Sequence, residues 1–194
     1  MKNYISVGIT GGIGSGKSYV CQIIETMGYP VFYADAEAKK IINEDPSAIR
    51  AVTSVFGTEA YNKDGLNSTY IAQKVFKDNS LREELNAIIH PRVRQRFNDW
   101  ALKSGSKIVF TEAAILFETG SYKNYDFICL ITAPYDLKIS RVKKRSGLSE
   151  EEIKSRMDSQ WSDEKKIPLA DFIIINDESE PLLPQVVNMI KQVQ

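Results

Sequence analysis

Short apolar runs alternate with stretches of helical period along most of the chain. The runs have strand length, and they lie at residues 4–10, 31–33, 108–111, 127–131 and 172–175. Continuous apolar runs of this length are typical of buried parallel strands, while apolar residues spaced by three and four predict amphipathic helices between them. The pattern predicts one α/β core.

Residues from about 36 to 105 interrupt this alternation. They show helical apolar spacing and contain no predicted strand. We therefore expect a single domain with a core at residues 1–35 and 106–194 and a helical insertion that serves as a substrate lobe.

Two prolines in the insertion fit helix starts. Pro46 and Pro91 are preceded by polar residues, and proline is favoured in the first turn of a helix. A helix start at Pro91 makes His90 a cap-region residue that faces a cleft or solvent. A lone histidine is more often structural than catalytic, so both roles stay open at this point.

A second group of helices follows the fourth run. A helix is expected from about Tyr135 to Ser146, and Ser149-x-x-Glu152 has the capping-box form that opens another, which holds Arg156 and Gln160. A terminal helix is expected to begin at Pro181. Residues from about 141 to 166 form a candidate lid.

A glycine-rich motif follows the first run. Gly11-Gly-Ile-Gly-Ser-Gly-Lys-Ser18 matches G-x-x-x-x-G-K-[ST] in full, with a predicted strand before it and an amphipathic helix after it. Glycines let backbone N–H groups turn inward around phosphates, and the helix presents its positive dipole end to the same anion. Lys17 can reach the β- and γ-phosphates, and the Ser18 hydroxyl can ligate Mg²⁺. The expected ATP-binding residues of this motif are Gly12, Ile13, Gly14, Ser15, Gly16, Lys17 and Ser18.

Several functional classes share such a loop. A GTPase usually carries Asn-Lys-x-Asp to bind guanine, but Asn62-Lys63-Asp64 lies in the helical insertion and not after a late strand. ATPase motors are usually larger. The small size and the inserted lobe favour a small-molecule kinase. The alternatives are a kinase that acts on a nucleoside monophosphate or on another small molecule, and a nucleotide-dependent switch.

Two acids follow predicted strands. Asp35 comes after residues 31–33 and is a candidate base for an alcohol acceptor; the alternative is that it caps a helix that begins near Ala36. Glu112 ends the third run and is a candidate Mg²⁺ ligand through water, or else an ordinary charge at the end of a strand.

Arg141 and Arg145 are four residues apart and share one helix face. Arginines on a mobile segment can close over a γ-phosphate and neutralise its developing charge. The alternative is a solvated basic face, which is the usual role of a charge run.

Composition limits the partners. The chain has 194 residues, of which 43% are hydrophobic, and its 25 Lys and Arg balance 25 Asp and Glu. A formal net charge of zero argues against a broad nucleic-acid or membrane surface. Cys21 and Cys129 lie far apart in apolar stretches and are expected to be buried, reduced thiols. We expect a cytoplasmic protein, either a monomer or a weak homo-oligomer.

Taken together, the motifs resemble the dephospho-CoA kinase family over nearly the whole chain. Beyond the glycine-rich loop, the motifs that carry the resemblance are Ala34-Asp35-Ala36, His90-Pro-Arg-Val-Arg94, Ile115-Leu-Phe-Glu118, Arg141-x-x-x-Arg145, Arg156-x-x-x-Gln160, Ala170-Asp171 and the last strand up to Asn176. One departure is Glu112-Ala-Ala114, where the family usually has Asp-x-Pro.

The resemblance implies a three-layer P-loop NTPase fold with a five-stranded parallel sheet, a helical CoA-binding insertion and a lid. It implies transfer of the γ-phosphoryl group of ATP, with Mg²⁺, to the ribose 3′-hydroxyl of dephospho-CoA. Carried over by motif, Asp35 is the base. Arg141, Arg145 and Asn176 serve the lid and the adenine. His90, Arg94 and Glu118 belong to the acceptor site.

Overall fold

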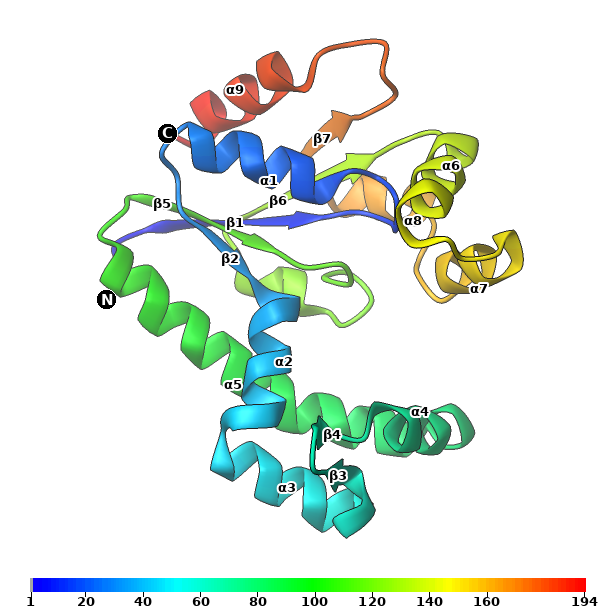
Figure 1. Ribbon diagram of the computed structural model, residues 1–194. Coiled ribbons are helices and arrows are strands. Elements are labelled where there is room, and N and C mark those ends of the chain that lie inside the picture. The colour runs from blue at the N-terminus through cyan, green and yellow to red at the C-terminus, as the bar shows by residue number, and fades with distance from the viewer. Residues whose placement is uncertain (1) are drawn as a thin grey trace. The chain divides into compact units, whose positions relative to one another are not determined.

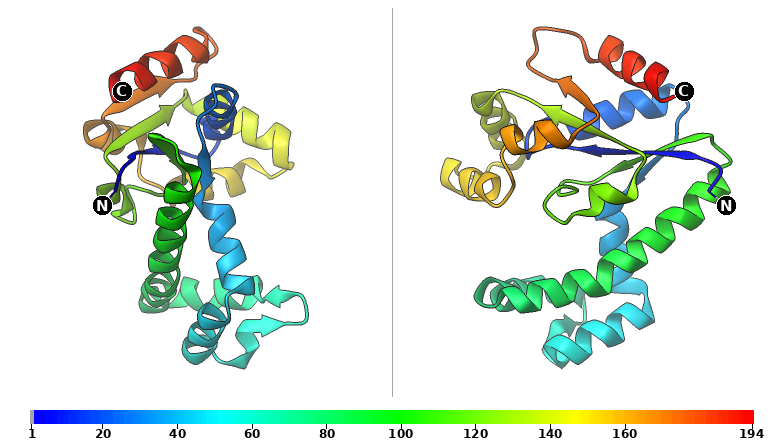
Figure 2. Two further views of the ribbon diagram at one scale, coloured as in Figure 1. Left: turned by 90° about the vertical axis from the view of Figure 1, so that its left-hand side faces the viewer. Right: turned by 180° about the vertical axis from the view of Figure 1, so that it is seen from behind.

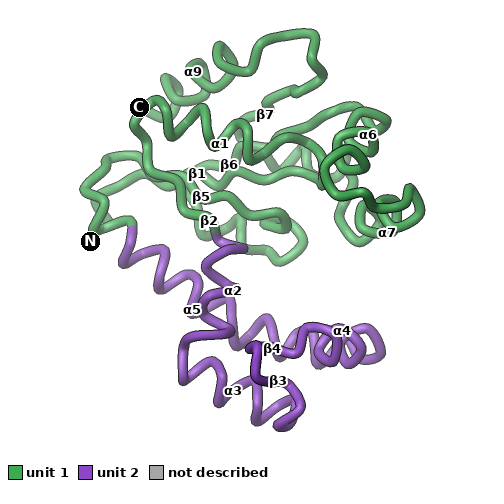
Figure 3. The backbone as a smooth tube through the Cα atoms, viewed as in Figure 1, with its two compact units in different colours: residues 1–33, 101–194 green, residues 34–100 purple. Residues whose placement is uncertain are grey.

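The computed structural model describes residues 2–194, which form two compact units (Figure 3). Unit 1 comprises Met1–Tyr33 and Ala101–Gln194, and unit 2 is Ala34–Trp100. Unit 2 begins two residues before the insertion expected from the sequence and ends five residues before its expected end.

Unit 1 is built on a five-stranded parallel sheet, as predicted. The strand order is β2-β5-β1-β6-β7, and every neighbouring pair is parallel. The strands are β1 (Ile5–Thr10), β2 (Val31–Tyr33), β5 (Ile108–Glu112), β6 (Phe127–Thr132) and β7 (Phe172–Ile175). Because all five run in one direction, their carboxyl ends meet at one edge, where ligands bind in open α/β sheets.

The helices of unit 1 fall into two groups (Figures 1 and 2). The long helices α1 (Lys17–Thr26) and α9 (Leu182–Val193) lie together on one face of the sheet. The other group gathers beyond the carboxyl ends of the strands. It consists of α6 (Tyr135–Ser146), α7 (Glu150–Asp158) and α8 (Asp163–Lys166), and the short 3₁₀ turn η3 (Ile167–Leu169) connects α8 to β7. A further 3₁₀ turn, η2 (Ser121–Asn124), precedes β6.

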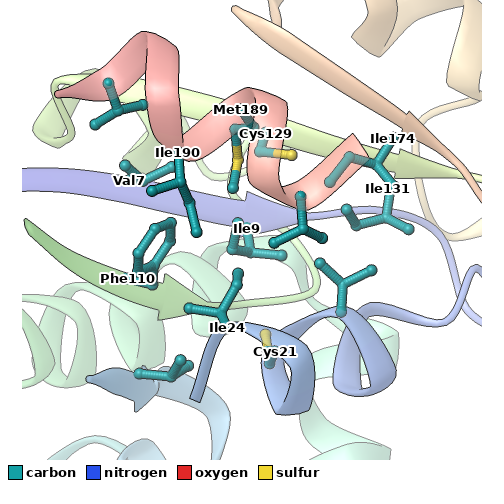
Figure 4. Close-up of a cluster of buried hydrophobic side chains, with 14 of the residues drawn as sticks. Val7, Ile9, Cys21, Ile24, Phe110, Cys129, Ile131, Ile174, Met189 and Ile190 are labelled. Atoms are coloured by element: carbon teal, nitrogen blue, oxygen red, sulfur yellow. The ribbon is translucent and has the colours of Figure 1, made fainter. Parts of the chain in front are cut away.

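The core of unit 1 lies between the sheet and the pair α1 and α9 (Figure 4). Val7 and Ile9 of the central strand are fully buried, and they are covered by Ile24 of α1 and Ile190 of α9. The thiols of Cys21 and Cys129 are free and buried in this cluster, as predicted, and burial raises the pKa of both.

Unit 2 is mostly helical. Its helices are α2 (Ala34–Glu44), α3 (Pro46–Phe56), α4 (Ser68–Lys77) and α5 (Asn79–Ser104), whose last turn belongs to unit 1. Pro46 is the first residue of α3, as predicted, and the Asp45 carboxylate before it accepts the N–H groups of Ser47 and Ala48.

The prediction that the insertion contains no strand is wrong. After the 3₁₀ turn η1 (Thr58–Ala60), β3 (Tyr61–Asn62) and β4 (Gly65–Leu66) form an antiparallel hairpin. Two-residue strands are too short to show apolar alternation. The turn residues Asn62 and Gly65 were the sequence signal that could have predicted the hairpin. In the structure the Asn62 side chain accepts the N–H of Asp64, and Gly65 has a φ of 109°. This turn includes the sequence that superficially resembles a guanine-binding motif.

The prediction that Pro91 starts a helix is also wrong. Pro91 lies inside α5, and His90 is a mid-helix residue and not a cap residue. Proline removes one helical N–H, and α5 bends midway along its length (Figure 2). The helix continues because apolar residues on both sides, Ile89 and Phe97, are buried, and because Arg92 donates to the carbonyl of Ile88 at 2.6 Å.

The longest helix, α5, has 26 residues and carries charged side chains along its length. Within residues 2–194, no helix combines the length and the apolar character that crossing a membrane requires.

Candidate active site

The glycine-rich loop connects the end of β1 to the start of α1. Gly16 precedes α1 in the left-handed conformation, with a φ of 94°. The backbone N–H groups of Gly14 and Gly16 have no acceptor among residues 2–194. Unpaired N–H groups at a helix N-terminus form an anion site, so the loop can receive phosphate oxygens.

Close packing explains why two of the loop positions are glycine. A Cβ atom on Gly14 would lie 2.5 Å from the carbonyl oxygen of Lys138 in α6. A Cβ atom on Gly16 would lie 2.1 Å from Nδ2 of Asn176, which follows β7. Both glycines also have positive φ, so larger residues would be strained as well as crowded.

The Lys17 ammonium lies against the loop. Its Nζ donates to the carbonyl oxygens of Gly11 at 2.8 Å and Gly12 at 3.3 Å. The positive charge of Lys17, which was predicted to contact the β- and γ-phosphates, therefore already lies beside the loop.

Asn176 and Arg141, both predicted to bind ATP, contact each other beside the loop. The Asn176 amide donates to the Ser15 carbonyl at 2.9 Å and accepts from the Arg141 guanidinium at 3.1 Å. Arg141 also pairs with Glu178 at 2.9 Å, a residue that the sequence analysis missed. Glu178 has a φ of 68°, and no local sequence motif could have predicted its contact with Arg141.

The candidate metal ligands are Ser18 and Glu112. Ser18 is exposed in the first turn of α1, and Glu112 is the last residue of β5, in register with Ile9 of β1. Burial, Glu112 and Glu25 raise the pKa of the Cys21 thiol, whereas Lys17 acts in the opposite direction. Glu112 and Lys17 therefore both lie near the buried side of α1.

This donor set fits a magnesium ion that keeps most of its water. Mg²⁺ is commonly held by one or two protein oxygens together with water and substrate phosphates. Within residues 2–194, no group of three or more His, Cys, Asp or Glu side chains forms a metal cage. A hydroxyl and one strand-end carboxylate are therefore the ligands that the loop region offers.

Three of the candidate acceptor residues, Asp35, His90 and Arg94, belong to unit 2. Asp35 lies in the first turn of α2, which begins at Ala34, so it does not occupy the cap position before the helix. Its side chain is exposed, and its carboxylate accepts no hydrogen bond from residues 2–194. His90 and Arg94 are four residues apart on α5 and share a helix face, and burial lowers the pKa of His90.

Comparison with known proteins agrees with this chemistry. A family model described as dephospho-CoA kinase matches residues 5–181. A protein named dephospho-CoA kinase from Bacteroides fragilis is 41% identical over 187 residues, which cover 96% of this chain and 91% of that protein.

The chain belongs to the dephospho-CoA kinase family.

Solved structures share the fold, and one of them is a dephospho-CoA kinase. A dephospho-CoA kinase from Campylobacter jejuni is 29% identical, has a TM-score of 0.69 and aligns over 100% of this chain and 98% of its own. A Thermus thermophilus structure titled TT1252 is 32% identical, with a TM-score of 0.85, and covers 99% and 97% of the two chains. A shikimate kinase from Acinetobacter baumannii, with a TM-score of 0.55 and 14% identity, covers 98% and 93% and shares the P-loop kinase fold.

Membership of the dephospho-CoA kinase family makes the chain a phosphotransferase that uses ATP as a substrate. The loop geometry is consistent with this activity, because the open N–H groups and Lys17 lie where a triphosphate is held in P-loop proteins.

Glu118, of the family's Leu-Phe-Glu motif, makes its contacts with the segment after α7. Its Oε1 accepts the Trp161 N–H at 2.9 Å and lies 2.8 Å from the buried ammonium of Lys166. The substrate-binding role predicted for Glu118 stays a prediction, and its visible role is to hold this segment.

Two arginines of the candidate lid are exposed. Arg145 lies in the last turn of α6 and Arg156 in the last turn of α7. Neither guanidinium makes a hydrogen bond or an ion pair within residues 2–194. Both are therefore available for a ligand, while Arg141 is already paired.

Proposed function

We propose that the chain phosphorylates the ribose 3′-hydroxyl of dephospho-CoA and that Asp35 accepts the proton of that hydroxyl. An alcohol is a poor nucleophile until its proton is removed, so this acceptor requires a base. The proposal is supported by the exposed Asp35 carboxylate, which accepts no hydrogen bond within residues 2–194 and is free to contact a substrate.

The loop provides the donor side of the transfer. In this proposal the N–H groups of Gly14 and Gly16 bind phosphate oxygens, and Lys17 neutralises charge on the β- and γ-phosphates. Asn176 and Arg141 border the adenine. Arg145, on the lid, contacts the transferred group as its charge develops.

Ser18 and Glu112 would hold Mg²⁺, directly and through water respectively. The ion supplies charge neutralisation between the phosphates when it is bound. The residues of the chain hold and orient ATP around it.

The acceptor side is assigned to unit 2 and the Leu-Phe-Glu loop. Asp35 removes the proton, while His90, Arg94 and Glu118 bind dephospho-CoA. Its phosphates favour a basic contact such as Arg94.

The experiment that tests the proposal is mass spectrometry of dephospho-CoA incubated with the protein, ATP and Mg²⁺. We expect a gain of one phosphate, and digestion with a 3′-nucleotidase should remove it. A phosphate at another position would refute the assigned acceptor. Parallel incubations with AMP, CMP and dTMP test the alternative of a nucleoside monophosphate kinase.

We further propose that the protein is cytoplasmic, that it acts as a monomer or a weak homo-oligomer, and that it needs no nucleic-acid or membrane partner. The balanced charge supports this view. Sedimentation at several concentrations, with and without ATP, tests the oligomeric state.

A further inference from the structure

One N–H group of the phosphate loop donates to a side chain from outside the loop, and that of Ser15 donates to the carbonyl of Gly12 within it. Whereas the N–H groups of Gly14 and Gly16 have no acceptor within residues 2–194, the N–H of Ile13 donates to Oε1 of Gln160 at 2.9 Å. Gln160 is 147 residues away in the sequence. A side chain from outside the loop therefore holds this N–H group, while Asn176 holds the Ser15 carbonyl.

Gln160 belongs to a segment that hydrogen bonds and ion pairs hold in place. We call residues 159–166, between the end of α7 and the end of α8, the connector. Next to Gln160, the N–H of Trp161 donates to Glu118, and at the far end of the connector Lys166 pairs with the same carboxylate. Lys166 is fully buried, and removing one partner of a buried ion pair is strongly destabilising. The connector is thus held against the loop that follows β5.

A second ion pair holds the connector to α6. Lys138, which is 7% exposed, pairs with Asp163. A Cβ atom on Gly12 would lie 3.6 Å from Nζ of Lys138 and 3.7 Å from Oε1 of Gln160. The glutamine oxygen and the ion pair therefore lie directly over Gly12, in contact range of the phosphate loop.

We propose that Gln160 is a positioning residue for ATP binding. By accepting the Ile13 N–H, it holds the loop in the conformation that directs the neighbouring N–H groups to the phosphates before the nucleotide arrives. Binding to a loop that is already ordered avoids the cost of ordering it at that moment. This role rests on the proposed placement of ATP in the loop, and it is distinct from any contact of Gln160 with substrate.

The test compares two substitutions of an amide by an apolar side chain of similar size. Gln160→Met removes the acceptor for the Ile13 N–H. The matched control is Asn43→Leu, because the Asn43 side chain likewise accepts one backbone N–H, that of Leu66, at 2.8 Å, but within unit 2. Gln160→Glu is the conservative variant, since it keeps an acceptor oxygen at the same position.

Three measurements are made on each variant: exchange of the Ile13 amide hydrogen by NMR, the Kd of ATP by calorimetry, and KM for each substrate. In Gln160→Met the Ile13 amide should exchange faster, and the Kd of ATP should rise about fivefold, the size expected for one net hydrogen bond. KM for dephospho-CoA should stay within about twofold, which a general loss of structure would not allow. Asn43→Leu should change neither quantity at the loop, and Gln160→Glu should keep the Ile13 amide protected.

Several results would overturn this role. Tighter ATP binding by Gln160→Met would show that Gln160 competes with the nucleotide, and an unchanged Kd would show that it does not position the loop. Equal losses in Gln160→Met and Asn43→Leu would indicate a general stability effect. If Gln160→Met does not fold, Gln160→Asn, whose shorter side chain withdraws the oxygen, takes its place. Failure of the unmodified protein to bind ATP would overturn the proposed function as well, whereas normal binding with no Gln160 effect would overturn this inference alone.

Discussion

Unit 1 and unit 2 differ in the size of their clusters of buried apolar side chains. Among residues 2–194, the sheet of unit 1 shares one cluster of buried residues with α1 and α9, from Val7 in β1 to Val193 in α9. Unit 2 instead has two small clusters, of four and three buried residues, around Val52 and Ile41. Small clusters open locally at a lower free energy than a continuous core does. Unit 1 is therefore suited to hold a fixed loop, and unit 2, which is proposed to bind the acceptor, should open locally more easily.

The candidate site residues show the same contrast. In unit 1 the loop is surrounded by partly or fully buried polar side chains, among them Asn176, Lys138 and Gln160, each with a named partner. In unit 2 the Asp35 carboxylate is exposed. Preorganised groups contribute to catalysis without reorganisation at the moment of reaction, while exposed groups depend on the substrate to complete their surroundings. The proposed nucleotide site in unit 1 is therefore ordered before ATP binds.

The largest effect is expected from Lys17→Met in unit 1. Removing the charge that neutralises the transferring group should lower kcat at least about 10³-fold, in line with the loss of a strong electrostatic contact in the transition state. Single-turnover phosphoryl transfer to dephospho-CoA measures the effect. A variant with kcat within tenfold of the original would remove Lys17 from its assigned place.

The next effect concerns unit 2. If Asp35 is the base, Asp35→Asn should lower kcat about 10²-fold, and it should leave the Kd of ATP unchanged because the residues proposed to hold ATP lie in unit 1. Asp64→Asn, in the hairpin turn, is the matched control and should retain activity. Equal loss of ATP binding and turnover in Asp35→Asn would contradict the proposal that unit 1 binds ATP while unit 2 provides the base.

The sequence predicted the architecture of unit 1 well because its signals are local. Continuous apolar runs became β1, β2, β5, β6 and β7, and the capping box Ser149-x-x-Glu152 opens α7 as expected. Unit 2 was predicted less well. Proline usually ends or kinks a helix, yet α5 continues through Pro91. Burial of the apolar residues on both sides outweighs the lost hydrogen bond, and this burial is a tertiary effect that the local sequence does not show.

The site divides in the same way. The loop chemistry could be predicted because one short motif contains it, from Gly11 to Ser18. The contacts that hold the loop could not, since Ser15 and Asn176 are 161 residues apart. Lys138 gave no signal, because a lysine in a charged helix is usually solvated, and only the fold reveals that it is buried beside Asp163.

A smaller effect sharpens the comparison of the two cores. Ile24→Val in unit 1 and Ile41→Val in unit 2 each remove one methylene from a side chain that is at most 1% exposed, and each should cost about 1 kcal/mol of unfolding free energy. The two should differ in where hydrogen exchange accelerates. Ile41→Val should affect amides of residues 34–100 and leave those of β1 and β6 unchanged, since the small clusters open locally.

Ile24→Val should instead affect the amides that exchange only by global unfolding. Matching exchange profiles for the two variants would mean that the units open together, and the contrast drawn from their cores would then be wrong.

The smallest effect follows from the single histidine, in unit 2. Burial holds the pKa of His90 below its usual value of 6.5, so the unfolded chain binds a proton that the folded chain does not as the pH falls through that value. The free energy of unfolding should therefore decrease between pH 7 and pH 5.5. Carboxylates whose pKa is lowered, such as Glu37 beside Lys40 and Arg96, lose their contribution only at lower pH. Urea unfolding of His90→Gln should show a flatter pH dependence over this interval. The same slope in both proteins would mean that the His90 side chain is solvated in the folded state, and unit 2 would then be looser still than its small clusters indicate.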